Sequence, residues 1–137
     1  MAAYLAKLSG PLLDRIDLHV EVPVVPVEAL THTPSGETSA QIRARVVKAQ
    51  RYRTRRGQRH SNAQLGSKEL KTSCAMTPEA AGLLKAAMRE LTLSARSYTK
   101  ILKISRTIAD LAESHRILPE HIAEAIQYRS LDRQLWT

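Results

Sequence analysis

The chain has 137 residues, of which 43% are hydrophobic and none is phenylalanine, so it is long enough for one domain with a modest aliphatic core. It has no apolar run near the roughly 20 residues of a membrane span, no recognisable signal sequence and only one cysteine, which together indicate a cytoplasmic protein without disulfides. The net charge is +8, and residues 41–60 hold eight of the 21 Lys and Arg residues but no acidic residue.

The residues up to about 35 are predicted to form an arm that contains one β-strand. Apolar and polar residues alternate over 16–22, which is the period of a strand with one buried face, and Pro23 and Pro26 end the segment. No second strand is predicted, so the backbone groups of this orphan strand would lack a partner. We therefore expect that the chain has been cut from a larger protein, and that residues 1–35 are partly disordered on their own.

From residue 36 onward the sequence predicts helices. Thr38 and Gln41 fit a capping box, so the first helix should run from about 39 to 56 and end at Gly57. The other helices are a possible short one near 67–71, one from Thr77-Pro78 to about 91, one that begins after Ser94, and one that begins at Pro119. These elements predict a mainly α fold, with residues 36–137 as a bundle of four or five helices behind the arm.

The helix after Ser94 has the strongest periodicity. Its apolar stripe, at spacings of three and four, consists of Tyr98, Ile101, Ile104 or Ser105, Ile108, Leu111 and Ala112. Its predicted solvent side consists of Arg96, Lys100, Lys103, Thr107 and Asp110. This pattern predicts a helix that packs against the bundle with one face and exposes the other face to solvent.

The helix predicted at 39–56 carries most of the excess positive charge. Ile42, Val46 and Ala49 form its predicted buried stripe, and the opposite side holds Arg45, Lys48, Arg51, Tyr52 and Arg55. Cations at this spacing repel one another when no acid lies between them, whereas nucleic-acid phosphates neutralise them and release counterions. We therefore predict non-specific DNA binding by this face, with Tyr52 available to stack on a base. The alternatives are contact with an acidic protein and a merely solvated face.

Several kinds of catalytic or metal site are not indicated. The sequence has neither a G-x-x-x-x-G-K-[ST] loop nor a G-x-G-x-x-G turn, and its five histidines have no metal-ligand spacing. Cys74 has no activating partner near it in the sequence, which indicates a packing role. We therefore expect no cofactor or metal in this chain alone, and no nucleotide hydrolysis by it.

Three stretches of the sequence together resemble a known family. They are GPLLDRIDLHVEVP at 10–23, LSARSYTKILKISRTIADL at 93–111 and HIAEAIQYRSLDR at 121–133, and SGETSAQIRARVVKAQ at 35–50 also fits the pattern. They resemble the C-terminal part of the magnesium-chelatase-like AAA+ ATPases of the YifB type, the family of the competence protein ComM. The resemblance implies that residues 1–35 end an AAA+ core and that residues 36–137 are its helical lid. The Walker motifs would lie upstream.

The resemblance also implies a role for Arg15. In related AAA+ proteins, a turn similar to LLDRID at 12–17 carries an arginine finger. By that resemblance Arg15 reaches the γ-phosphate of ATP in a neighbouring subunit, where a guanidinium stabilises the charge on the transferring phosphoryl group. The alternative is that Arg15 pairs with Asp14 or Asp17 on the surface.

A second implied role belongs to the start of the lid helix. Ser94-Ala95-Arg96 resembles the [ST]-x-R motif of the family's sensor 2, an arginine that contacts nucleotide of its own or a neighbouring subunit. A cation in the first turn is unfavourable for the helix dipole, which hints at a role other than helix stability. Arg106 is the alternative sensor.

For the parent protein the resemblance implies ATP, Mg²⁺ and a homo-oligomeric ring that acts as a DNA-remodelling or branch-migration helicase. This chain would supply the finger, the sensor and the basic helix. Two other hypotheses come from different classes: a self-contained DNA-binding helical module, and a protein-interaction lid that docks an acidic partner.

Overall fold

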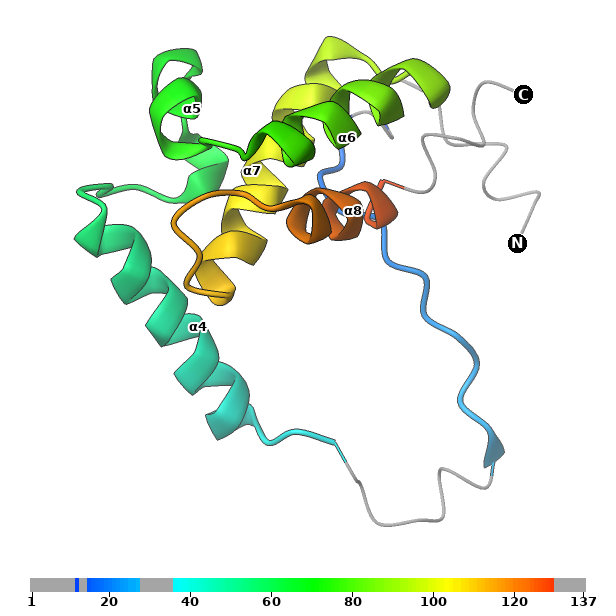
Figure 1. Ribbon diagram of the computed structural model, residues 1–137. Coiled ribbons are helices and arrows are strands. Elements are labelled where there is room, and N and C mark those ends of the chain that lie inside the picture. Colours follow the sequence, from blue (N-terminus) through cyan, green and yellow to red (C-terminus); the bar gives the residue numbers. More distant parts are fainter. Residues whose placement is uncertain (1–11, 13–14, 28–35, 130–137) are drawn as a thin grey trace.

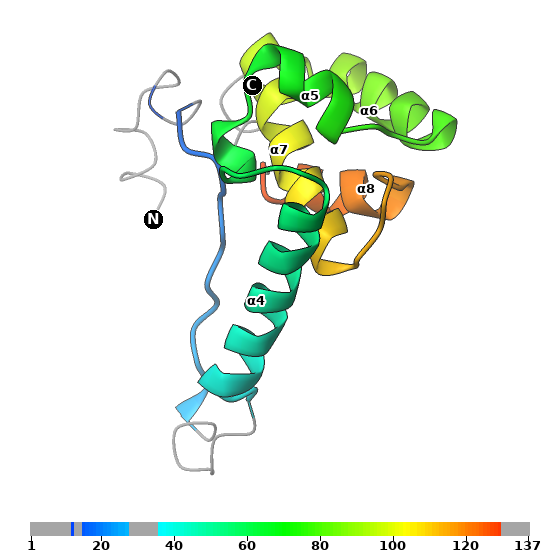
Figure 2. The same cartoon turned by 90° about the vertical axis from the view of Figure 1, so that its left-hand side faces the viewer.

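The computed structural model describes residues 12, 15–27 and 36–129, and the described part is mainly helical (Figure 1). The elements in order are α4 (Ser39–Arg55), the 3-10 turn η1 (Asn62–Gln64), α5 (Ser67–Ser73), α6 (Pro78–Glu90), α7 (Ala95–Leu111) and α8 (Pro119–Gln127). The predicted mainly α fold with four or five helices is confirmed, and the described residues contain five α-helices of more than one turn. Helix α7 contacts α4, α5 and α8, whereas the N-terminal half of α4 extends away from the other helices (Figure 1 and Figure 2).

The helices begin at the predicted caps. The Thr38 hydroxyl accepts the backbone N–H of Gln41 at 3.3 Å, and the Gln41 side chain accepts the backbone N–H of Thr38 at 2.8 Å, which completes the capping box. The Ser94 hydroxyl accepts the backbone N–H of Ser97 at 3.0 Å and so caps α7. These contacts place the Ser94-x-Arg96 motif at the start of the central helix, as the sequence predicts.

The core is aliphatic and lies around α7. Its buried members are Leu65, Cys74, Ala80, Leu84, Ile101, Leu102, Ala109, Ile117, Ile122 and Ala125. A single parallel bridge between Met76 and Ile117 joins the segments that lead into α6 and α8. Burial raises the pKa of the Cys74 thiol to about 11, so the thiol stays protonated at neutral pH. The predicted packing role of Cys74 is confirmed.

The predicted strand at 16–22 was wrong. No strand is found among the described residues, and this segment runs as irregular chain (Figure 1). A ladder needs a second strand, whereas the backbone N–H of His19 donates instead to the carbonyl of Tyr128, at 2.7 Å. His19 is buried, although the alternation places it on the solvent-exposed side of the predicted strand. On the predicted buried side, Leu18, Val20 and Val22 are 50%, 67% and 78% exposed. Whether the arm is disordered on its own stays a prediction, since residues 1–11, 13–14 and 28–35 lie outside the described residues.

Two predictions about helix faces were also wrong. Helix α4 has no buried residue, and Ile42 and Val46 of its expected buried stripe are 43% and 44% exposed. On α7, Asp110 was expected on the solvent side but is 2% exposed. The N-terminal half of α4 extends away from the other helices, so Ile42 and Val46 have little to pack against (Figure 1). Helix α7 has neighbours on several sides, so residues outside its apolar stripe are buried, whereas Leu111 of the stripe is 42% exposed.

His121 gives the fold a predicted pH dependence. Its ring is 5% exposed, and its Nδ1 accepts the backbone N–H of Leu118 at 3.0 Å. Burial lowers the pKa of His121 below the ordinary histidine value of about 6.5, so the folded chain binds this proton less readily than the unfolded chain does. The stabilisation is therefore present above pH 6.5 and is lost as the pH falls through the folded pKa.

The measurement is urea unfolding across this pH range for the wild type and for His121→Gln, in which the amide oxygen can still accept the Leu118 N–H. We expect the free energy of unfolding to fall more steeply below pH 6.5 in the wild type than in the variant. Parallel curves would contradict the prediction, because the other histidines are common to both proteins.

Candidate functional site

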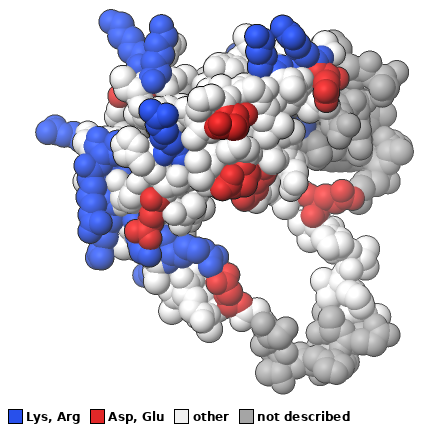
Figure 3. Space-filling model, viewed as in Figure 1, with Lys and Arg blue, Asp and Glu red and all other residues white. Residues whose placement is uncertain are grey.

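The basic face of α4 is present in the structure, but part of it is neutralised. Lys and Arg side chains gather along α4 in the space-filling view (Figure 3). Arg45 forms a two-pronged pair with Glu37, with nitrogen–oxygen distances of 2.6 and 2.9 Å, and these contacts lower the pKa of Glu37. Lys48 forms an ion pair with Glu113, which lies just beyond the end of α7. The sequence prediction missed both acids because they come from outside the helix.

The C-terminal half of the basic face is more open. Arg51 and Arg55 are exposed and form no ion pair with an acid in the described ranges. Tyr52 lies between them in sequence and is half-buried. An open hollow of about 570 Å³ runs over this end of α4 beside Arg51, Arg53 and Arg55. The charge available to an outside anion is therefore greatest at this end of the helix.

A buried charged cluster fixes the end of α4 to α7. Asp110 accepts hydrogen bonds from Arg56 at 2.6 and 3.2 Å, from Arg106 Nε at 3.1 Å, and from Asn62 at 2.9 Å. Gln58 bridges the same group, since it donates to Asn62 Oδ1 at 2.8 Å and accepts from Arg56. Both charges of the Arg106–Asp110 pair are almost fully buried, so the cluster joins α4 and α7 inside the fold and is not a surface site. Sequence reasoning missed it, although the i,i+4 spacing of Arg106 and Asp110 was a signal.

Arg106, the alternative sensor, lies inside this cluster. Its side chain is fully buried, and its guanidinium also donates to the carbonyls of Ser114 at 2.6 Å and His115 at 3.0 Å. Burial lowers the pKa of Arg106 and the charge of Asp110 opposes that shift. In this arrangement Arg106 ties α7 to the loop that follows it and presents no nitrogen to solvent.

Arg96 lies on the surface at the opposite end of α7. It is exposed and lines a hollow of about 370 Å³ with Lys100 and Lys103 of the same helix and Asp17 of the arm. The Lys100 ammonium is 2.8 Å from Asp17 Oδ1. The structure thus brings the segment that follows Arg15 to the same place as Arg96.

Arg15 itself is exposed, in a turn in which its backbone N–H donates to the carbonyl of Leu12 at 3.0 Å. Asp17, one of the two partners considered for Arg15, pairs with Lys100 instead. Asp14, the other, lies outside the described residues. Within those residues the Arg15 side chain is open to an outside group.

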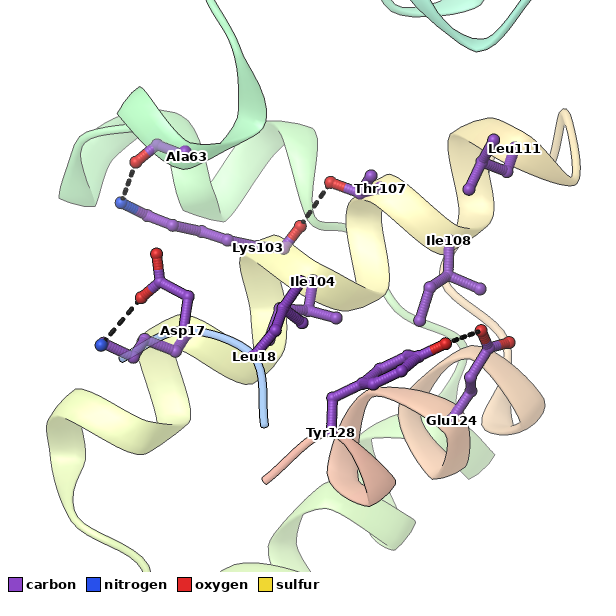
Figure 4. Close-up of a pocket in the computed structure, with 11 residues that line it drawn as sticks. Asp17, Leu18, Ala63, Lys103, Ile104, Thr107, Ile108, Leu111, Glu124 and Tyr128 are labelled. Carbon is purple, nitrogen blue, oxygen red and sulfur yellow. Dashed lines mark hydrogen bonds and ion pairs between the residues drawn. The ribbon is translucent and has the colours of Figure 1, made fainter. Parts of the chain in front are cut away.

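An apolar groove beside this region was not predicted. It has a volume of about 320 Å³ and lies between α7, α8 and the arm (Figure 4). Its apolar wall includes Ile104, Ile108 and Leu18, and the Tyr128 hydroxyl at its edge donates to Glu124 at 3.3 Å. The signal in the sequence was the apolar stripe of α7, which is only partly covered here.

No group of three or more His, Cys, Asp and Glu side chains with the arrangement of a metal site occurs in the described ranges. None of the helices within those ranges has the length and hydropathy of a membrane span.

Comparisons with known proteins agree over nearly all of the chain. Residues 36–129 match the family described as magnesium chelatase, subunit ChlI C-terminal, and residues 1–30 match magnesium chelatase, subunit ChlI. The chain is 46% identical over 133 residues to the competence protein ComM of Haemophilus influenzae, and the match covers 96% of the chain and 26% of that relative. It is 41% identical to the uncharacterized protein YifB of Escherichia coli and 40% identical to that of Salmonella typhimurium, with the same coverage. The chain thus spans about a quarter of the length of these relatives.

Proposed function

Because the chain belongs to the magnesium-chelatase-like family of ComM and YifB, as its C-terminal region, we propose that it is the lid end of a ring-forming AAA+ ATPase that remodels DNA. The observation that carries the proposal is the family match over 36–129 on a domain that exposes a basic helix. The two family matches end and begin at residues 30 and 36, which supports the predicted boundary near 35. Branch migration along DNA is the activity that we propose for the assembled ring.

In this proposal the chain contributes cations to ATP hydrolysis. Arg15 acts in trans as the arginine finger, and Arg96 is the lid sensor, because Arg96 is exposed whereas Arg106 is buried in the Asp110 cluster. Since the arm brings Asp17 beside Arg96, both arginines would act on one side of the subunit. A guanidinium fits the spread charge of a phosphoryl group, so these residues suit ATP phosphates. Mg²⁺ and the rest of the nucleotide would be held by the upstream core.

The chain also contributes a DNA contact. The open end of α4, with Arg51 and Arg55, would follow the phosphate backbone without reading its sequence. Arg45 and Lys48 would contribute less, because each already has a carboxylate partner. The exposed basic face also favours the second candidate function, a DNA-binding module that works without the rest of the protein.

The test is fluorescence anisotropy of the chain with labelled single-stranded, duplex and forked DNA at two salt concentrations. We expect Arg51→Gln with Arg55→Gln to weaken binding roughly tenfold and to reduce the slope of log affinity against log salt by about two, one for each lost phosphate contact. The matched pair Arg45→Gln with Lys48→Gln removes the same charge, but we expect only about a two- to threefold loss.

Equal losses in the two variants would mean that binding follows net charge alone, and the assignment to the end of α4 would be wrong. Tight binding of an unrelated acidic polymer, with no dependence on DNA length, would favour the protein-interaction lid instead. No binding to any form of DNA at low salt would contradict a DNA contact by the isolated domain.

A further inference from the structure

Three cations of α7 line one hollow in which Asp17 is the single acid among the residues that the structure describes. Arg96, Lys100 and Lys103 are spaced i, i+4 and i+7, so they follow one face of the helix over roughly 10 Å. Cations at this spacing repel one another. The acid is Asp17, which lies 79 or more positions away in the sequence, on the arm. The described lining of the hollow therefore holds three positive groups and one negative group.

The Lys100 side chain is largely shielded from solvent. Its exposed fraction is only 13%, whereas that of the Asp17 side chain is 65%. The ammonium has three N–H donors, and its ion-pair partner among the described residues is Asp17 Oδ1, 2.8 Å away. Lys103 uses one donor on the carbonyl of Ala63, at 2.7 Å. A largely buried ammonium has donors beyond the one that faces Asp17, and such a cation suits an anion that has several acceptor oxygens.

We propose that Arg96, Lys100 and Lys103 form one binding surface for the oligophosphate chain of a nucleotide, and that the Asp17 carboxylate occupies the place of one phosphate until the nucleotide displaces it. The inference rests on the proposed sensor role of Arg96 and extends it to two lysines and a built-in competitor. It also gives the arm a regulatory part, because Asp17 lies two residues from the proposed finger Arg15.

Displacement of Asp17 is physically reasonable because little holds it. The pair with Lys100 is exposed on the acid side, and such pairs contribute little stability in water. A phosphate group carries more charge and more acceptor oxygens than a carboxylate, so it can engage Lys100 and a neighbouring cation together. Release of Asp17 would then free the arm near Arg15 when nucleotide binds.

The test is isothermal titration of the 137-residue chain with inorganic tripolyphosphate at low ionic strength. Lys100→Gln should weaken binding about three- to tenfold, and Asp17→Asn should tighten it by a similar factor, because one change removes a ligand contact and the other removes a competitor. The matched controls are Lys85→Gln and Glu90→Gln on α6, which change the net charge equally. Both should stay within about twofold of the wild type. Thermal unfolding of each variant would confirm that it is folded.

The two substitutions are expected to change the affinity in opposite directions, so a general effect of net charge or of unfolding cannot imitate the result. The proposal fails if Asp17→Asn binds no more tightly than Glu90→Gln, if Lys100→Gln binds as Lys85→Gln does, or if the wild type does not bind tripolyphosphate. If Arg96→Gln alone weakens binding, the sensor role stands and only the extension to Lys100 and Asp17 falls.

Two further titrations, with ATP and with duplex DNA, identify the source of the phosphate. ATP should show the same dependence on Lys100 and Asp17, whereas short duplex DNA should instead depend on Arg51 and Arg55. If the binding of duplex DNA depends on Lys100 and the binding of ATP does not, the assignment of this site to a nucleotide is wrong. Loss of DNA binding with tripolyphosphate binding intact would contradict the proposed DNA role and leave this site unaffected.

Discussion

Replacing Asp110 with alanine is expected to lower the free energy of unfolding by about 3–5 kcal/mol. The carboxylate is 2% exposed and is the common acceptor for Arg56, Arg106 and Asn62. Its removal leaves the Arg106 guanidinium buried without a counter-ion, and that is the costly way to break a buried ion pair. Urea unfolding followed by circular dichroism measures the loss.

A double variant separates charge from packing. Asp110→Leu with Arg106→Met removes both charges and keeps side-chain volume, so much of the lost stability should return. Glu113→Gln is the exposed comparison, because it breaks the pair with Lys48 and should cost less than about 1 kcal/mol. A double variant as unstable as Asp110→Ala would mean that the loss comes from Arg56 and Asn62, which lose Asp110 in both variants, and not from the buried Arg106 charge.

The helix starts could be predicted because their causes are local. Thr38 and Gln41 are three residues apart, and Ser94 caps a backbone N–H only three residues away. The capping contacts can therefore be predicted from a stretch of a few consecutive residues. The basic segment was located for the same reason, since its charges are consecutive in the sequence.

The burial of Asp110 on the predicted solvent side of α7 could not be predicted from periodicity, because the residue Arg56 that covers it is distant in the sequence. Asp110 is buried by Arg56, which is 54 positions away, and periodicity assigns every charged residue to the solvent. The strand prediction failed for a similar reason, since alternation describes a strand only when another strand is present to pair with it. For the candidate sites, the residue types were readable, but their partners Glu37, Glu113 and Asp17 became visible only in three dimensions.

In the full-length protein, Arg15→Ala is expected to lower kcat for ATP hydrolysis by about 10³–10⁵ while KM for ATP changes little. The proposed contact forms fully only as charge develops on the transferring phosphoryl group, so its loss raises the barrier rather than weakening binding. Arg15→Lys should remain strongly impaired, because a point charge does not reproduce the two-pronged guanidinium. Arg116→Ala, at an exposed arginine in the loop between α7 and α8, serves as the matched control and should keep nearly full activity.

Mixing subunits tests whether Arg15 acts on a neighbour. Rings of Arg15→Ala subunits should be inactive, as should rings of subunits whose own ATP site has been disabled upstream. A mixture of the two should regain activity, because a subunit with an intact ATP site can then meet a neighbour that carries an intact Arg15. An unchanged mixture would place Arg15 in its own subunit's site. A kcat within about tenfold of wild type for Arg15→Ala would return Arg15 to the alternative role of a surface charge, since a trans finger contributes far more than that.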